Sequence, residues 1–133
     1  MAPFGEHAAW FVFTSERFDT SSELPPEANA GNRFYGRDVA DFLAARLTER
    51  GLDASFFDED WGWQVHALRE DGTVLEVSIH HDPDEGWELM LRALRKERRL
   101  GVVRGREVEL DEAGRSVLQA VFDEAGIELR RTR

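Results

Sequence analysis

The stretch WGWQVHALREDGTVLEVSIHH, Trp61–His81, decides the fold of this 133-residue chain. Two runs that alternate apolar and polar residues flank the turn residues Glu70–Gly72, a pattern that predicts a β-hairpin. Two loop lengths are compatible with this turn. One is a two-residue Asp-Gly loop, and the other is a three-residue loop with Gly72 in the left-handed conformation.

The apolar pattern decides between the two registers, because a slip of one residue exchanges the two faces of a strand. The two-residue loop would place apolar residues opposite polar ones. The three-residue loop makes one face nearly all apolar, so we predict that register. Its pairs are Trp61 with His81, Trp63 with Ile79, Val65 with Val77, and Ala67 with Leu75. The opposite face then carries the polar residues Gln64, His66, Glu76, Ser78 and His80.

Two segments outside the hairpin are expected to form amphipathic helices. Arg37–Arg50 has apolar residues at helical spacing and is followed by Gly51, a residue favoured just after a helix. The second helix begins after Asp111, a good N-cap, and ends at Gly126. We expect the core to contain Phe42, Leu43, Leu47, Trp63, Val65, Val77, Ile79, Val117, Leu118, Val121 and Phe122.

The remaining segments supply further strands and one loop. Ala8–Phe13 predicts a strand buried on both faces, and Asp53–Asp58 predicts a strand that enters the sheet. Ile127–Arg131 has room for a short final strand. Asp19–Gly36 is a long loop by composition. Trp87–Leu100 is ambiguous, because its composition favours a helix whereas its first residues alternate as a strand does.

Two motifs in the first half of the chain resemble a known pattern. Gly36–Leu43 matches G-x-x-[VLF]-A-x-[WF]-L in the first helix, and Glu59–Trp63 reads E-D-W-G-W at the start of a strand. Together they resemble a group of small, uncharacterised bacterial proteins over roughly residues 34–95. The resemblance implies that Trp87–Ala93 is a strand, with a helix as the alternative. It implies no activity.

The predicted fold is therefore a single α+β domain over residues 1–133. We expect a mostly antiparallel sheet of about five or six strands with two helices packed on one face. The predicted order of elements is β-α-β-β-β-β-α-β. An exposed sheet edge would also allow a homo-oligomer.

Charge is strongly segregated along the chain, which has a net charge of −10. Asp53–Glu88 holds eleven acidic residues and one basic residue, whereas Arg92–Arg106 holds seven basic residues and one acidic residue. The acidic block would repel nucleic-acid backbones and attract a basic protein, so a nucleic-acid partner is not expected. The basic run could contact phosphate, but such runs more often form solvated or self-paired surface.

Composition excludes several classes of protein. The chain has no cysteine, which excludes a disulfide scaffold, an iron–sulfur protein and a thiol enzyme. No apolar run approaches the ~20 residues that span a membrane, and the first residues lack the features of a signal peptide. We expect a cytoplasmic protein with no membrane contact and no cofactor.

One candidate site lies on the polar face of the hairpin. His66, Glu76 and His80 are expected to share that face, and two imidazoles with a carboxylate are the minimum for a metal site or an acid–base pair. The more common outcome for such a face is an exposed polar surface or a polar surface packed under a loop. This cluster supports the alternative hypothesis of a metal-binding protein or a hydrolase-type enzyme.

A second candidate site is an acidic rim at one end of the sheet. The register places Trp61 beside His81 and so brings two acidic runs to the same end. The rim residues are Asp58, Glu59, Asp60, Trp61, Asp82, Asp84 and Glu85. Such a rim fits an arginine-rich surface on a partner. We therefore favour a non-enzymatic interaction module, for example an immunity-type or antitoxin-like acidic protein that binds a basic bacterial effector.

Overall fold

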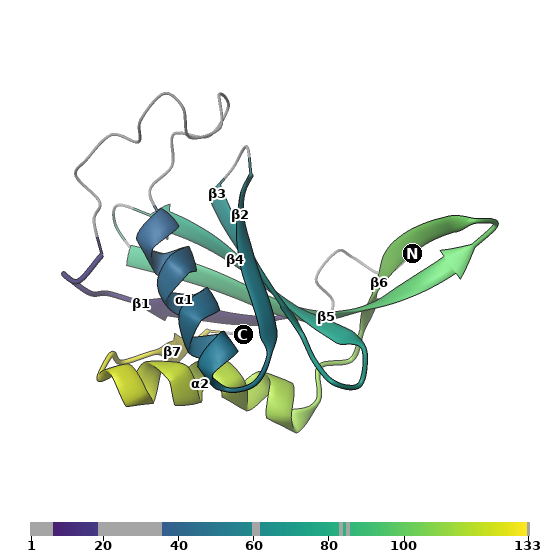
Figure 1. Ribbon diagram of the computed structural model, residues 1–133. Helices are drawn as coiled ribbons and strands as arrows, with labels where there is room; N and C mark the ends of the chain where they lie inside the picture. The colour runs from purple at the N-terminus through teal and green to yellow at the C-terminus, as the bar shows by residue number, and fades with distance from the viewer. Residues whose placement is uncertain (1–6, 19–35, 60–61, 83, 85, 133) are drawn as a thin grey trace.

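The computed structural model describes residues 7–18, 36–59, 62–82, 84 and 86–132, with backbone alone at 97–99 and 102–104 (Figure 1). Within these described residues, seven strands and two helices follow one another. They are β1 (Ala9–Phe13), α1 (Arg37–Glu49), β2 (Asp53–Glu59), β3 (Gly62–Leu68), β4 (Thr73–Asp82), β5 (Gly86–Arg99), β6 (Val102–Val108), α2 (Glu112–Ala125) and β7 (Arg130–Arg131).

All seven strands belong to one antiparallel sheet, in the order β2-β3-β4-β5-β1-β7. The first half of β5 pairs with β1, and its second half pairs with β6. The predicted α+β class is thus confirmed, with one strand, β6, that the sequence did not predict. The strand interpretation of Trp87–Ala93 is also confirmed and the helix alternative is wrong, because these residues pair with strands on both sides.

The predicted hairpin register is confirmed by the pairs Trp63 with Ile79 and Val65 with Val77. Gly72 has φ = 89°, as the three-residue loop requires. The turn is closed by the Arg69 N–H, which donates to the Thr73 carbonyl at 2.9 Å. The alternation of apolar residues therefore fixes which face of the hairpin enters the core.

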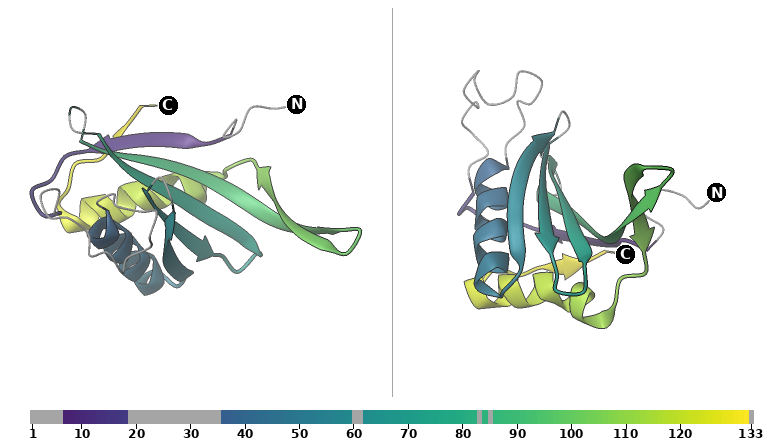
Figure 2. Two further views of the ribbon diagram at one scale, coloured as in Figure 1. Left: turned by 90° about the horizontal axis from the view of Figure 1, so that it is seen from above. Right: turned by 45° about the vertical axis from the view of Figure 1, so that its right-hand side comes forward.

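Both helices cover the same face of the sheet and share one core with it (Figure 2). The predicted core residues are buried, except that Val117 is half-buried against the core. The Asp111 side chain caps α2 by accepting the Gly114 N–H at 2.7 Å, and the helix ends at Gly126 with φ = 74°. The sequence signals for this helix are thus borne out at both ends.

The prediction that the first strand is buried on both faces is wrong for β1. This strand is buried on one face only, since Phe11 and Phe13 are buried but Trp10 and Val12 are half-buried. Trp10 and Val12 point away from both helices. We call the side opposite the helices the open face.

Of the predicted loop Asp19–Gly36, residues 19–35 lie outside the described residues. In the described chain, neither helix is long and apolar enough to cross a membrane.

Candidate binding groove on the open face

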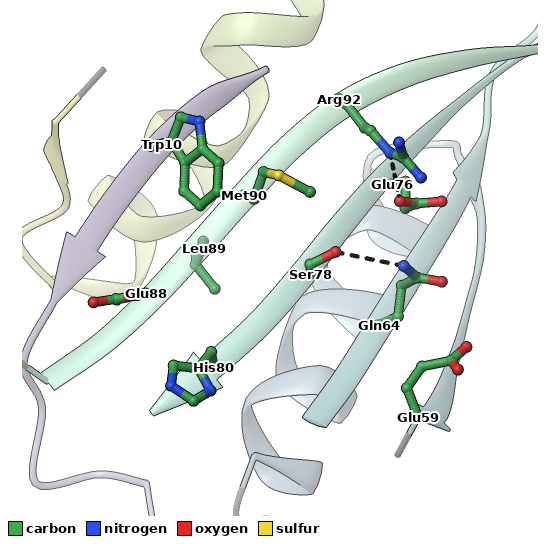
Figure 3. A pocket seen from close by; sticks show the side chains of 10 residues that line it. All are labelled: Trp10, Glu59, Gln64, Glu76, Ser78, His80, Glu88, Leu89, Met90 and Arg92. Atoms are coloured by element: carbon green, nitrogen blue, oxygen red, sulfur yellow. Dashed lines mark hydrogen bonds and ion pairs between the residues drawn. The ribbon is translucent and has the colours of Figure 1, made fainter. Parts of the chain in front are cut away.

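A groove of about 520 Å³ lies on the open face (Figure 3). Its lining comes from five neighbouring strands, β1 to β5, starting at the edge strand β2. The side chains that matter for its chemistry are Trp10, Glu59, His80, Glu88, Met90 and Arg92. Its volume lies in the range of sites that bind a small ligand or a few side chains of a partner.

One wall of the groove is apolar. Trp10 on β1 pairs with Met90 on β5, and Met90 pairs with Ser78 on β4. Figure 3 shows the Trp10 ring and the Met90 side chain next to each other along this wall. Residues two apart on a strand share a face, so the same alternation that buries Leu89 turns Met90 toward the groove.

An ion pair between Arg92 and Glu76 closes one end of the groove (Figure 3). The Arg92 Nε donates to Glu76 Oε1 at 2.7 Å, and the His66 Nε2 lies 3.3 Å from Glu76 Oε2. His66 Nε2 is also 2.9 Å from Gln64 Oε1. Because both neighbours are acceptors, Nε2 carries a proton and donates. Glu76 lies on the polar face of the hairpin, as the register predicts, and is only 4% exposed.

Glu76 is ionised in this environment. Burial opposes ionisation and would raise the pKa of Glu76, but the hydrogen bonds from His66 and Arg92 outweigh it and hold the pKa below 4.5. Both carboxylate oxygens already accept from protein donors. Glu76 therefore fixes the positions of Arg92 and His66 across three strands.

The other end of the groove is negatively charged. Glu59 on β2 and Glu88 on β5 flank it, and His80 lies between them on β4 (Figure 3). Within the described ranges, neither Glu59 nor Glu88 has a cationic group within 4.0 Å. Gly62 is the residue opposite Glu59. A Cβ there would lie 2.6 Å from the Ile79 carbonyl oxygen, so a side chain does not fit.

The residues predicted as a metal or acid–base cluster are only partly brought together. His66 and Glu76 are neighbours, whereas His80 lies four residues from Glu76 along β4, or about 13 Å at the usual strand rise. Among the residues with described positions, no three histidine or acidic side chains are grouped so as to hold a metal ion. The donors around Glu76 are an arginine and a protonated imidazole nitrogen, which fit a metal poorly.

The predicted acidic rim is divided between the two faces. Glu59 lines the groove, but Asp58 is paired with Trp63 and so belongs to the helix-covered face. Asp82 ends β4, and its side chain accepts the N–H of Asp84 at 2.8 Å. The antiparallel order brings the end of β2 and the β4–β5 turn to the same end of the sheet. The remaining rim residues, Asp60, Trp61 and Glu85, lie outside the described residues.

Four groove residues were missed from the sequence: Trp10, Glu88, Met90 and Arg92. Three of them follow from a signal that was present, since a strand that buries Leu89 and Leu91 must turn Glu88, Met90 and Arg92 the other way. The position of Trp10 depends on the pairing of β1 with β5, which are about 75 residues apart. No local pattern indicates that pairing.

No family model, curated protein or solved structure matches this chain. The resemblance of residues 34–95 to small bacterial proteins therefore stays a prediction.

Proposed function

We propose that this protein is a non-enzymatic binding module whose groove takes a positively charged segment of a protein partner. One observation carries the proposal. Glu59 and Glu88 flank the groove with no cation within 4.0 Å in the described part of the chain. They lie on either side of a groove whose wall is formed by Trp10 and Met90.

An arginine or lysine side chain has the chemistry to match this surface. Its charged group gains a charge-assisted hydrogen bond from a carboxylate and a cation–π contact from the face of a tryptophan. Its aliphatic stem gains from contact with apolar surface such as Met90. Tryptophan is also among the residues that contribute most to protein–protein binding energy.

The charge of the whole chain supports a protein partner rather than a nucleic acid. The net charge is −10, and Asp53–Glu88 carries most of the excess. Complementary charge speeds association with a basic protein and repels phosphate backbones. An immunity-type or antitoxin-like protein that blocks a basic bacterial effector would use a surface of this kind.

The geometry around Glu76 favours binding over the alternative of a metal-binding protein or hydrolase. A catalytic carboxylate or metal ligand needs an oxygen that faces the substrate or ion. Both oxygens of Glu76 are engaged by Arg92 and His66, and His80 lies too far along β4 to join them. This arrangement is typical of a polar cluster that holds neighbouring strands in place.

Site-specific photo-crosslinking in the native cell tests the proposal. Benzoylphenylalanine is placed at Met90 in the groove or, as a control, at the exposed Ala45 on α1. We expect a basic protein to be crosslinked from position 90 and not from position 45. The Glu59→Lys/Glu88→Lys variant should lose that product, and the matched Glu128→Lys variant, changed at an exposed site outside the groove, should keep it.

Two results would contradict the proposal. One is equal crosslinking from both positions, which would indicate nonspecific contact. The other is a product from position 90 that persists when both groove carboxylates are reversed.

A further inference from the structure

The outer halves of β5 and β6 form a two-stranded ribbon, residues 95–106, which we call the basic arm. It projects away from the rest of the sheet in all three views (Figures 1 and 2). Leu100 and Gly101 form its turn with φ values of 52° and 80°. The Leu100 side chain at the tip is fully exposed.

The charge of the basic arm is unbalanced. Its sequence holds six basic residues and one acidic residue. The register places Arg95 directly opposite Arg106, and like charges in such a pair destabilise a ribbon. Arg95 and Lys96 are exposed, and within the described ranges neither has a carboxylate within 4.0 Å. Arg95 lies at the base of the arm, where it pairs with Thr73 on β4 and interacts electrostatically with Asp71, and Lys96 lies one residue further out.

We infer that the basic arm of one copy lies in the open-face groove of a second copy, and that two copies exchange arms to form a dimer. The inference rests on the proposed function, because it assigns a specific cationic occupant to the same groove. Charge complementarity carries it: Arg95 and Lys96 meet the end flanked by Glu59 and Glu88. The exposed Leu100 supplies an apolar contact for the wall formed by Trp10 and Met90.

The dimensions of the two surfaces agree. The two strands of the arm lie one strand spacing apart, or about 5 Å, which is the width that the groove must admit. Glu59 and Glu88 are separated by three strand spacings, or about 14 Å. A contact between an arm and a groove uses two different surfaces and does not close by itself. Reciprocal exchange of arms closes the assembly under two-fold symmetry.

Sedimentation equilibrium of the full chain in 50 mM and 500 mM salt tests the inference. We expect a dimer at low salt, with a dissociation constant at least about tenfold weaker at high salt because exposed charges are screened. Arg95→Glu/Lys96→Glu reverses the two arm charges assigned to the groove, and Glu59→Arg/Glu88→Arg reverses the two carboxylates that flank it. Each variant alone should be monomeric. Arg37→Glu and Glu128→Arg, which change exposed charges outside both surfaces, should remain dimeric.

Mixing the two reversed variants makes the test specific. Both arm–groove contacts of a mixed dimer pair opposite charges, so an equimolar mixture should recover the dimer that each variant lost. Thermal unfolding of every variant shows whether loss of the dimer reflects loss of the fold. Recovery on mixing would itself show that both variants are folded.

Three results would overturn the inference: a chain that stays monomeric at low salt, a dimer that both reversals leave intact, and a mixture that stays monomeric. The photo-crosslinking experiment separates this failure from failure of the proposed function. A monomer that crosslinks a basic protein from position 90 overturns only the arm exchange. A salt-sensitive dimer that crosslinks only its own chain overturns only the role of a separate partner.

Discussion

The two faces of one sheet have different roles in this protein, and β5 shows the difference between adjacent residues. Leu89 and Leu91 are fully buried under the helices, whereas Glu88, Met90 and Arg92 face the groove. Burial of apolar area holds the first face together. The second face has the ion pair at Glu76 and two carboxylates, Glu59 and Glu88, that we propose take part in binding. Stability and binding should therefore respond to different substitutions along the same strand.

The largest loss of stability is expected from a substitution on the helix-covered face. Leu89→Ala removes a fully buried side chain and should lower the free energy of unfolding by about 2–5 kcal/mol, the usual cost of a lost core leucine. Met90→Ala, one residue later on the open face, should cost less than about 1 kcal/mol. Urea unfolding of both variants measures the difference. Equal losses would mean that the groove is part of the core.

Substitution of Glu76 should give the next largest loss of stability. Glu76 is the open-face residue whose loss should lower the free energy of unfolding strongly. Glu76→Ala removes the Glu76 carboxylate from Arg92, whose side chain is 12% exposed. We expect a loss of about 2–3 kcal/mol, somewhat less than for a fully buried pair. Ser78→Ala, a neighbour on the same face, should change stability by less than about 0.5 kcal/mol. Similar values for the two variants would show that the Glu76 ion pair contributes little.

The stabilising effect of Glu76 should depend on pH. The folded-state pKa of Glu76 lies below its ordinary value of 4.5. A lowered pKa stabilises the fold fully above 4.5, and this contribution is lost as the pH falls through the folded-state pKa. The difference in unfolding free energy between wild type and Glu76→Gln should therefore be constant at neutral pH and shrink below 4.5. A difference that grows on acidification would contradict the assignment.

The cap of α2 should contribute less to the free energy of unfolding than the ion pair at Glu76. Asp111→Ala removes the side chain that accepts the Gly114 N–H and also pairs with Arg69, and it should cost about 1 kcal/mol. Asp111→Asn keeps the cap acceptor and should cost less than half as much. Thermal unfolding resolves the two. If the asparagine variant loses as much stability as the alanine variant, the ion pair with Arg69, not the cap, dominates.

The smallest effect on stability is expected at Glu88. Glu88→Gln removes a charge that has no ion-pair partner within the described residues, so stability should change by less than about 0.5 kcal/mol. Binding should nevertheless weaken, because the lost carboxylate is one of the two that flank the groove. Parallel unfolding and crosslinking measurements separate the two properties. A large loss of stability would place Glu88 in the structural framework instead.

The helix-covered face could be predicted from the sequence because its signals are local. The alternation around Glu70–Gly72 fixes the hairpin register, and Asp111 and Gly126 mark the ends of α2. The open face could be predicted only in part. His66 and Glu76 follow from the hairpin, but the burial of Glu76 depends on Arg92 from a third strand. Trp10 reaches the groove through a pairing that is distant in sequence, and such pairings leave no local pattern.

The central claim is that the groove binds a cationic side chain beside Trp10, and an NMR titration tests it most directly. The probe is a capped pentapeptide of alternating arginine and glycine, and the observed signal is the Trp10 indole N–H, assigned with Trp10→Phe. We predict a saturable shift of that signal, lost in Glu59→Gln/Glu88→Gln and absent with a glutamine-for-arginine peptide. A Trp10 signal that does not move, or that moves equally with the glutamine peptide, would contradict the account.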